Sequence, residues 1–319
     1  MRKQIVNLWN QIMRIKVFYP IVIVGRKLIF SNTLNSMVDF LERHTNKKGL
    51  KETKDFFEKN KERIACNLDC LADGRSRQVY QNIIAYRSTL DRKCLKKARD
   101  PYKDQYFDSD LIHFRKKELF IDCGAYIGDT LAHLEHKYPY WNLKGGGITA
   151  LCLEPDSSNA VKCRRNIKKM EARHAGFSGY IMRKGVWKSE TTLYFKEGEE
   201  YSNQLSDIEK DQCTSVPAIS VDCAVQRYRE KTGDQQKVTF IKMDIEGSEP
   251  EALIGSLHTI QKDRPVLVIS IYHTKEQMIS ILEYCRNHLQ DYQYFIRHYS
   301  PAWGETDLYA IPCHLRYHE

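Results

Sequence analysis

The sequence lacks a long hydrophobic run. Its apolar N-terminal stretch, VFYPIVIV at residues 17–24, has eight residues and is interrupted by Pro20. A membrane-spanning helix needs about 20 apolar residues, because the hydrocarbon core is about 30 Å thick. Basic residues precede the stretch, as in a signal sequence, but GRK follows it without a small-residue cleavage site. We therefore predict a protein without a transmembrane segment.

A disulfide framework and a zinc motif are also missing. The ten cysteines include no Cys-x-x-Cys motif. Cys66 and Cys70, one helical turn apart, have no neighbouring His or Cys pair to complete a zinc site. Free thiols in a chain of this length are typical of a reducing compartment. The cysteine pattern therefore predicts a cytoplasmic protein without a structural metal.

Proline is scarce as well, with nine residues in 319, which excludes collagen-like and proline-rich disordered chains. Hydrophobic residues make up 42% and charged residues 29% of the chain, with nineteen tyrosines and four tryptophans. This is a globular composition that can bury a core. At about 150 residues per domain, the length favours two domains or one large domain with an extension.

Acidic residues are scarce only in the first third of the chain. Residues 1–116 hold 25 Lys and Arg against 13 Asp and Glu, a net charge of +12, whereas residues 117–319 hold 25 against 28, a net charge of −3. A basic region can bind nucleic acid or an anionic lipid surface, although lysines on solvated helices also produce one. The first acidic residue is Asp39, so the opening segment can make peripheral contact with a membrane. Packing of helices onto the main domain is the alternative.

The residue pattern divides the chain near residue 110. Between residues 31 and 100, apolar residues recur at helical spacing with many charged residues between them, which predicts surface helices. The segment 101–110, PYKDQYFDSD, interrupts this pattern with Pro, Asp and Ser. We predict a basic, mainly helical N-terminal extension over residues 1–110 and a second domain over residues 111–319.

The second domain has the pattern of an α/β sheet. Seven apolar runs of strand length are interleaved with helix-length segments at residues 157–174, 250–261 and 275–288. The predicted strands span residues 119–123, 150–153, 180–186, 238–243, 266–272, 292–298 and 307–311. Buried runs joined by helices predict a mainly parallel sheet with helices on both faces. The last two strands are predicted to pair antiparallel, and residues 191–195 and 216–221 to form an inserted hairpin.

A glycine turn follows the first predicted strand, in FIDCGAYIGDT. Gly124 and Gly128 are spaced Gly-x-x-x-Gly, and not Gly-x-Gly-x-x-Gly as in a dinucleotide site. Tyr126 and Asp129 add bulk and negative charge, which disfavours a phosphate. Asp122 at the strand end can instead accept a hydrogen bond from a cationic amino group or from water. A purely structural turn is the alternative.

The second predicted strand ends at Glu154, in LCLEPDSSN. A carboxylate there has two acceptor oxygens and the reach to hold both hydroxyls of a ribose. Glu154 lies 30 residues after Gly124, more than the roughly 20 of a dinucleotide site, and the glycines at residues 145–147 indicate a surface loop that accounts for the excess. Asp156 and the two serines after it have the pattern of a helix cap.

The fourth predicted strand leads into VTFIKMDIEGSEPEAL, where Lys242 and three carboxylates accompany an apolar run. Burying such charges costs free energy unless they are paired, so the cluster indicates a ligand site. Asp244 is the residue of this cluster that a structural role explains least well. Ser248 and Glu249, in contrast, fit the cap of a helix that begins near Pro250.

The fifth and sixth predicted strands deliver further side chains. The sequence VISIYH ends with Tyr272 and His273, and FIRHYS contains Arg297 and His298. The carboxyl ends of parallel strands meet at one edge of a sheet. We therefore predict that His273 lies close to Asp244.

Several of these motifs, taken in order, resemble one family. FIDCGAYIGDT, LCLEPD, GVWKSETTLYF, FIKMDIEGSEPEAL, LVISIYH and the closing RHYS with ETDLYA are similar to the FkbM-type S-adenosylmethionine-dependent methyltransferases, in the branch with a helical N-terminal extension. The resemblance covers about residues 105–312, and residues 1–100 match only loosely. It implies a class I methyltransferase fold, a Rossmann-like, seven-stranded, mainly parallel sheet with helices on both faces.

The resemblance also implies where the cofactor binds. It places Asp122, Gly124 and Gly128 around the amino-acid part of S-adenosylmethionine, and Glu154 on its ribose. Trp187 can form an aromatic wall for the adenine or can be a plain core residue. The full set expected around the cofactor is Asp122, Gly124, Ala125, Tyr126, Gly128, Thr130, Glu154, Pro155, Val186 and Trp187.

Asp244 has the position of a substrate-side acid or metal ligand in many such enzymes. Residues 243–246, after the fourth predicted strand, are Met-Asp-Ile-Glu. Related enzymes that methylate amines or bases often have Asn-Pro-Pro-Tyr there, so the resemblance favours oxygen as the methyl acceptor. His273, or Asp244 directly, is the candidate base for a hydroxyl group. A cation held by Asp244, Glu246 and Asp222 would be Mg²⁺ rather than Zn²⁺, because no cysteine accompanies the set. We favour a reaction without a metal.

Three functions stay open at this point. The first is O-methylation of a hydroxyl on a small molecule or a glycan. The second is methylation of RNA through the basic extension, which the lack of an RNA-binding module disfavours. The third is a nonenzymatic binding protein on a methyltransferase fold, which the presence of Asp122, Glu154 and Asp244 disfavours.

Overall fold

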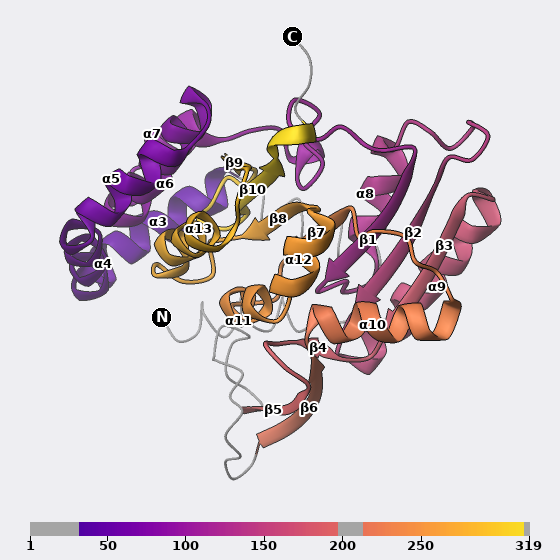
Figure 1. Ribbon diagram of the computed structural model, residues 1–319. Coiled ribbons are helices and arrows are strands. Elements are labelled where there is room, and N and C mark those ends of the chain that lie inside the picture. The colour runs from indigo at the N-terminus through magenta and orange to yellow at the C-terminus, as the bar shows by residue number, and fades with distance from the viewer. Residues whose placement is uncertain (1–31, 197–212, 316–319) are drawn as a thin grey trace.

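The computed structural model describes residues 32–196 and 213–315 (Figure 1). The apolar stretch at residues 17–24 and the membrane contact predicted for the opening segment lie outside these ranges. Within them, no helix combines the length and the apolar composition that crossing a bilayer requires.

A seven-stranded sheet forms the centre of the molecule (Figure 1). Its strands, in spatial order, are β3 (Phe177–Met182), β2 (Gly147–Leu153), β1 (Lys117–Cys123), β7 (Phe240–Met243), β8 (Val266–Ser270), β10 (Thr306–Pro312) and β9 (Tyr292–His298). The first five run parallel, and β10 is antiparallel to both β8 and β9. The predicted mainly parallel sheet and its terminal antiparallel pair are confirmed.

The strands are apolar because helices cover both faces of the sheet. Successive side chains point to opposite faces, so Leu119 and Ile121 of β1 join one hydrophobic cluster, and Phe120 joins the other. The first face carries α10 (Val221–Thr232), α11 (Glu249–Ile254), α12 (Leu257–Asp263) and α13 (Gln277–His288). The second face carries α8 (Asp129–Lys137) and α9 (Ser157–Arg173).

A second, smaller sheet contains the predicted hairpin. β5 (Thr191–Lys196) and β6 (Cys213–Ile219) pair antiparallel, as predicted, and β4 (Gly185–Val186) pairs with β6. The prediction of one strand over residues 180–186 is wrong, because β3 ends at Met182 and β4 belongs to the smaller sheet. Arg183, which is exposed, marks the point where the chain leaves the main sheet.

The single helix predicted over residues 250–261 is also wrong, because the structure has two helices there, α11 and α12. The break falls at Gly255. A Cβ at this position would lie 2.3 Å from the carbonyl oxygen of Trp187. The backbone at Trp187 can therefore come this close only because residue 255 is a glycine. The Asp222 amide of α10 then donates to the Gly255 carbonyl oxygen at 3.0 Å. The break between α11 and α12 therefore coincides with a tertiary contact of the Gly255 backbone.

The helices predicted before the sheet are α3 (Asn32–Thr45), α4 (Lys47–Lys59), α5 (Lys61–Cys70), α6 (Gly74–Thr89) and α7 (Arg92–Ala98), which lie beyond the β9 edge (Figure 1). α6 packs on β9, where the Ser76 hydroxyl accepts from the Ile296 amide at 3.0 Å. Val79 and Ile83 of α6 are buried in the same cluster as the sheet. Burying each such side chain contributes roughly 1.5–3 kcal/mol. The helices share a core with the sheet, and a domain boundary near residue 110 stays a prediction.

Candidate functional site

The ends of four neighbouring parallel strands meet at one edge of the sheet. Cys123 of β1 lies beside Leu153 of β2 and Met243 of β7, and Met243 lies beside Ile269 of β8. Most of the predicted site residues follow these four positions. Open α/β sheets bind ligands at this edge, which is therefore the candidate site.

Two glycines form the turn between β1 and α8. Gly124 has a φ of +82°, and a Cβ there would lie 2.0 Å from the carbonyl oxygen of Asp244. Its amide donates to the Leu153 carbonyl oxygen at 3.1 Å. Gly128, also at +82°, directly precedes α8. Because only glycine accepts this conformation together with such close contact, the turn joins the ends of β1, β2 and β7 tightly.

Glu154 is held at the end of β2 by two backbone amides. Its Oε2 accepts from the Tyr126 amide and its Oε1 from the Asp156 amide, each at 2.9 Å. Burial raises the pKa of this carboxyl to about 7, although the two amides oppose the shift. The Asn159 side chain also bonds to this carboxylate and lowers its pKa. The side chain of Tyr126 is 50% exposed.

The remaining residues predicted around the cofactor have less exposed surface. Three of them are buried or half-buried after β1 and β2, namely Ala125, Thr130 and Pro155. Val186 is buried in the main core, and Trp187 is 8% exposed and packs against Leu193 and Ala218 of the smaller sheet. Trp187 thus lies in a core environment, and its contact with an adenine stays a prediction.

Asp122 and Lys242 form a buried ion pair between β1 and β7. The Lys242 Nζ lies 3.1 Å from Asp122 Oδ1 and donates to the Gly124 carbonyl oxygen at 2.9 Å. Burial lowers the pKa of Lys242, but Asp122 and Asp244 raise it by more, so the ammonium stays charged. Within the structure, the cationic partner of Asp122 is therefore the ammonium group of Lys242. The predicted contact of Asp122 with the amino group of a ligand stays a prediction.

Asp244 follows β7 and is held by two phenol groups. Tyr106 Oη donates to Asp244 Oδ2 at 2.7 Å, and Tyr272 Oη donates to Oδ1 at 3.3 Å. Burial raises the pKa of Asp244, but Lys242 and His273 lower it by more, and the net shift is downward. Asp244 is therefore an anchored anion.

His273 follows β8 and lies between carboxylates. Its side chain is 5% exposed, and its Nε2 lies 3.4 Å from Asp244 Oδ1, so the predicted proximity is confirmed. Nε2 also lies 3.5 Å from Glu246 Oε2, and Nδ1 lies 3.2 Å from Glu249 Oε1. Burial lowers the pKa of His273, but the three carboxylates raise it to about 9. The imidazole therefore carries a proton at neutral pH and releases it as the pH rises through 9.

Glu249 is fixed in its position against His273. Its carboxylate is fully buried and accepts from the Ile245 amide at 2.8 Å and from Gln277 Nε2 at 3.1 Å. Ser248 occupies the N-cap position of α11, as predicted, but its side chain makes no capping bond, and the Glu249 carboxylate folds back onto the Ile245 amide. In the sequence, Glu249 is the last acidic residue of the run DIEGSE at residues 244–249. An acidic residue at this point also fits the first turn of a helix, so the sequence does not distinguish the two roles.

Two further residues reach the site without having been predicted there. Tyr106 comes from residues 99–116, between α7 and β1, where the sequence indicates only an interruption of the helical pattern. Glu305 precedes β10 and accepts from Gln105, and burial together with Asp244 raises its pKa to about 7. No local pattern marks either residue, because both reach the site through packing between distant segments.

Asp244, Glu249 and His273 each offer one metal-ligand atom within 4.8 Å of the others. The two carboxylates, however, face different ring nitrogens, Nε2 for Asp244 and Nδ1 for Glu249. A metal ion binds one imidazole nitrogen, so a single ion cannot use both contacts. Asp222, from the predicted Mg²⁺ set, instead accepts from the Thr259 amide at 2.8 Å. The geometry fits proton transfer better than cation binding.

His298, the other histidine at a strand end, has a different environment. It is fully buried, and its Nδ1 lies 2.9 Å from the Thr306 hydroxyl. Burial lowers its pKa to about 3, so the ring is neutral near pH 7. His298 therefore belongs to the packing of β9 against β10.

A family model and solved structures are similar to this chain. The family model for the methyltransferase FkbM domain matches residues 122–296, more than half of the chain. A search of the curated proteins finds no match. Among solved structures, the crystal structure of methyltransferase FkbM from Methylobacillus flagellatus KT is 24% identical with a TM-score of 0.64, covering 80% of this chain and 60% of that chain. The methyltransferase domain of METTL16 is 10% identical with a TM-score of 0.37, covering 62% of this chain and 60% of that chain.

The likeness to the Methylobacillus protein concerns the fold, and the present chain spans 60% of that protein's length. The strand order β3-β2-β1-β7-β8-β10-β9, with β10 antiparallel, is the class I methyltransferase fold expected from the sequence. With the family match over more than half of its length, the chain belongs to the FkbM methyltransferase family.

Proposed function

We propose that this protein transfers a methyl group from S-adenosylmethionine to a hydroxyl oxygen of a small molecule or a glycan in the cytoplasm. The observation that carries the proposal is the placement of His273 between Asp244 and Glu249 at the ends of β7 and β8. A hydroxyl acceptor must lose its proton, and an oriented histidine can take it. Membership of the family supplies methyl transfer as the class of reaction.

The ends of β1 and β2 have the groups that suit this cofactor. The Glu154 carboxylate at the end of β2 has the two oxygens and the reach to hold the hydroxyls of a ribose. When bound, S-adenosylmethionine supplies an electrophilic methyl group on a positively charged sulfur, a charge that suits an acidic site. The residues proposed to surround it are Asp122, Gly124, Ala125, Tyr126, Gly128, Thr130, Glu154, Pro155, Val186 and Trp187.

In this proposal His273 is the general base. The Glu249 carboxylate, 3.2 Å from Nδ1, favours a proton on that nitrogen, which leaves the Nε2 lone pair for the proton of the acceptor hydroxyl. The resulting imidazolium lies among Asp244, Glu246 and Glu249, whose negative charges stabilise it. Asp244 is already held by two phenols, so its role is to stabilise and orient rather than to take the proton itself.

The two contributions have different expected sizes. A general base typically contributes a factor of about 10² to 10⁴. Orientation of the acceptor oxygen towards the methyl group can contribute up to roughly 7–11 kcal/mol. Most of the rate enhancement is therefore expected from positioning, and the part assigned to His273 is the part that single substitutions can test.

RNA is the alternative acceptor that the basic N-terminal region suggests. Several arginines of this region instead form ion pairs within the chain: Arg63 with Glu283 at 2.6 Å, Arg75 with Asp100 at 2.7 Å, and Arg92 with Asp39 at 2.8 Å. These pairs neutralise part of the charge that would contact phosphates. We therefore propose no nucleic-acid partner.

A transfer assay tests the proposal. The purified protein is incubated with isotope-labelled S-adenosylmethionine and fractionated metabolites and glycans, and the products are analysed by mass spectrometry and NMR. We expect a labelled methyl group bound to oxygen. Methylated nitrogen, or methylation of RNA with a steep salt dependence, would contradict the proposed acceptor. Cofactor binding without transfer to any acceptor would favour a nonenzymatic binding protein.

A further inference from the structure

The segment between the N-terminal helices and the sheet contributes a side chain to the site. Tyr106 lies in residues 99–116, between α7 and β1, and is 9% exposed. Its Oη donates to Asp244 Oδ2 at 2.7 Å, across 138 residues of sequence. Its ring lies 5.3 Å from the Lys242 Nζ. One residue of the connecting segment thus contacts both charged groups at the end of β7.

The backbone around Tyr106 is fixed by its neighbours. Tyr106 has a φ of +63°, a conformation that a non-glycine residue keeps only where the surrounding structure enforces it. The preceding residue, Gln105, donates to Glu305. The following residue, Phe107, packs against Phe240 of β7 with the ring centroids 5.6 Å apart. These contacts hold the phenol group towards Asp244.

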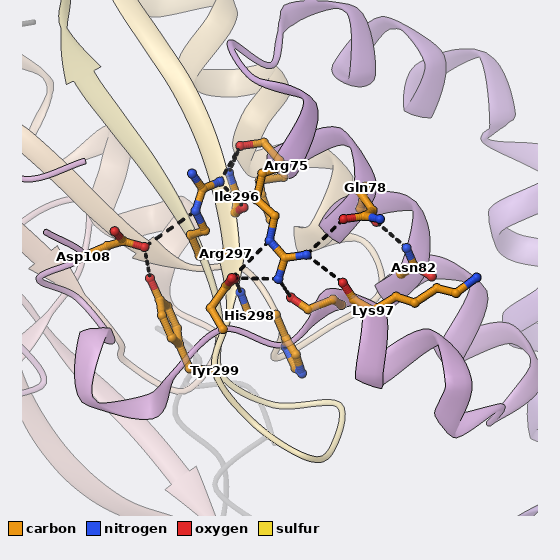
Figure 2. A network of polar contacts seen from close by, with 12 residues as sticks. Arg75, Gln78, Asn82, Lys97, Asp108, Ile296, Arg297, His298 and Tyr299 are labelled. Atoms are coloured by element: carbon orange, nitrogen blue, oxygen red, sulfur yellow. Dashed lines mark hydrogen bonds and ion pairs between the residues drawn. The ribbon is translucent and has the colours of Figure 1, made fainter. Parts of the chain in front are cut away.

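Two arginines tie this segment to the neighbouring elements (Figure 2). Near its N-terminal end, Arg75 of α6 donates to the Lys97 carbonyl oxygen at 2.6 Å and to the Asp100 carboxylate at 2.7 Å. Two residues after Tyr106, Asp108 Oδ2 lies 3.6 Å from the Nε of Arg297 of β9. Tyr106 therefore lies between an attachment to α6 and an attachment to β9.

We propose that Tyr106 is a positioning residue, which holds the Asp244 carboxylate beside His273. A phenol has one O–H group to donate, and Tyr106 uses it in the hydrogen bond to Asp244. Tyr106 therefore acts through the Asp244 carboxylate. This inference rests on the proposed function, because it assumes that Asp244 and His273 act in methyl transfer. Tyr106 lies outside residues 122–296, which the family model matches.

The first test is methyl transfer by Tyr106→Phe. The ring packing is retained and only the hydrogen bond to Asp244 is lost, so kcat should fall about tenfold, with unchanged cofactor affinity. In an Asp244→Ala background the same substitution should change kcat less than about twofold, because the acceptor of its hydrogen bond is gone. The matched control is Tyr86→Phe, which removes a phenol–carboxylate bond of 2.8 Å to Asp39 and should leave kcat unchanged.

Equal losses from Tyr106→Phe in both backgrounds, or a normal kcat in the single variant, would overturn the positioning role. A second readout does not depend on turnover. NMR titration of the His273 imidazole should give a higher pKa in Tyr106→Phe than in the wild type, because an Asp244 with one donor fewer attracts the imidazolium more strongly. Glu246 and Glu249 also face the ring, but neither bonds to Tyr106, and Tyr86→Phe should not move the titration.

The two readouts separate this inference from the proposed function. A wild-type protein that transfers no methyl group would refute the proposed function, and the titration would still decide the role of Tyr106. An unchanged His273 titration in a folded Tyr106→Phe variant would refute the positioning role, whatever the activity of the wild type.

Discussion

The two sides of the candidate site are built in different ways. The side at β1 and β2 consists of a glycine turn and Glu154, joined by the backbone amide of Tyr126. The side at β7 and β8 combines Asp244, His273 and Tyr106, which come from three separate parts of the chain. Backbone conformation fixes the first side, whereas tertiary packing fixes the second.

The charges on the two sides differ as well. At β1, the Asp122 carboxylate is paired with the ammonium of Lys242, and Glu154 accepts from backbone amides. At β8, three carboxylates face the single imidazole of His273. The first arrangement suits the binding of a ligand, and the second suits the gain and loss of a proton. Substitutions at β1 and β2 should therefore change affinity, and those at β7 and β8 should change turnover.

The largest expected effect is that of His273→Ala. If His273 is the base, kcat should fall by about 10² or more, and calorimetry should give a nearly unchanged affinity for S-adenosylmethionine. His288→Ala is a matched control, because that histidine is exposed on α13 and its Nδ1 contacts only the Tyr284 carbonyl oxygen, at 2.8 Å. Near-normal turnover of a folded His273→Ala protein would remove this residue from the mechanism.

The next effect concerns pH. Only unprotonated His273 can accept a proton, and its pKa is raised to about 9, so kcat/KM should rise about tenfold per pH unit from pH 7 and level off near 9. Burial lowers this pKa, and Glu249 is the largest contact that raises it. Glu249→Gln should therefore move the rise to lower pH. A profile that is flat between pH 7 and 9 in the wild type would contradict the assignment of the base.

A smaller effect is expected on the other side of the site. Glu154→Ala should weaken binding of S-adenosylmethionine, or of its demethylated product, by about 1.5–3 kcal/mol, the contribution of a hydrogen bond to a charged group. The turnover at saturating cofactor should be largely retained. Calorimetry measures the loss, with Glu230→Ala as a control on the exposed face of α10. Tight NAD binding without any response to S-adenosylmethionine would contradict the proposed cofactor.

The sequence predicts the first side more completely than the second. Gly124 and Glu154 each directly follow an apolar strand, which is a local pattern that the sequence shows. Because parallel strands end at one edge of a sheet, the same reasoning also predicts that Asp244 and His273 lie together. Tyr106 could not be predicted, because its contact with Asp244 depends on how the connecting segment packs across the sheet. Local patterns thus locate the site, and non-local packing completes it.

The errors in the fold have different origins. The predicted strand at residues 180–186 contains Arg183 and Lys184, which separate two parts that pair with strands of different sheets, so the sequence itself marks this break. The helical pattern at residues 250–261 breaks at Gly255, a residue of low helix propensity, and there the backbone lies against the carbonyl oxygen of Trp187. Only the folded structure brings Trp187 to this position.

The smallest expected effect is that of metal removal. Methyl transfer should fall less than about twofold after treatment with EDTA, because Asp244 is already held by two phenols and the two carboxylates lie against different nitrogens of His273. The measurement compares turnover before chelation, after it, and after addition of MgCl₂ or MnCl₂. A reversible loss restored by either salt would contradict the prediction. A cation bound at Nε2 would occupy the lone pair that takes the proton, so restored activity would also transfer the role of base from His273 to another group.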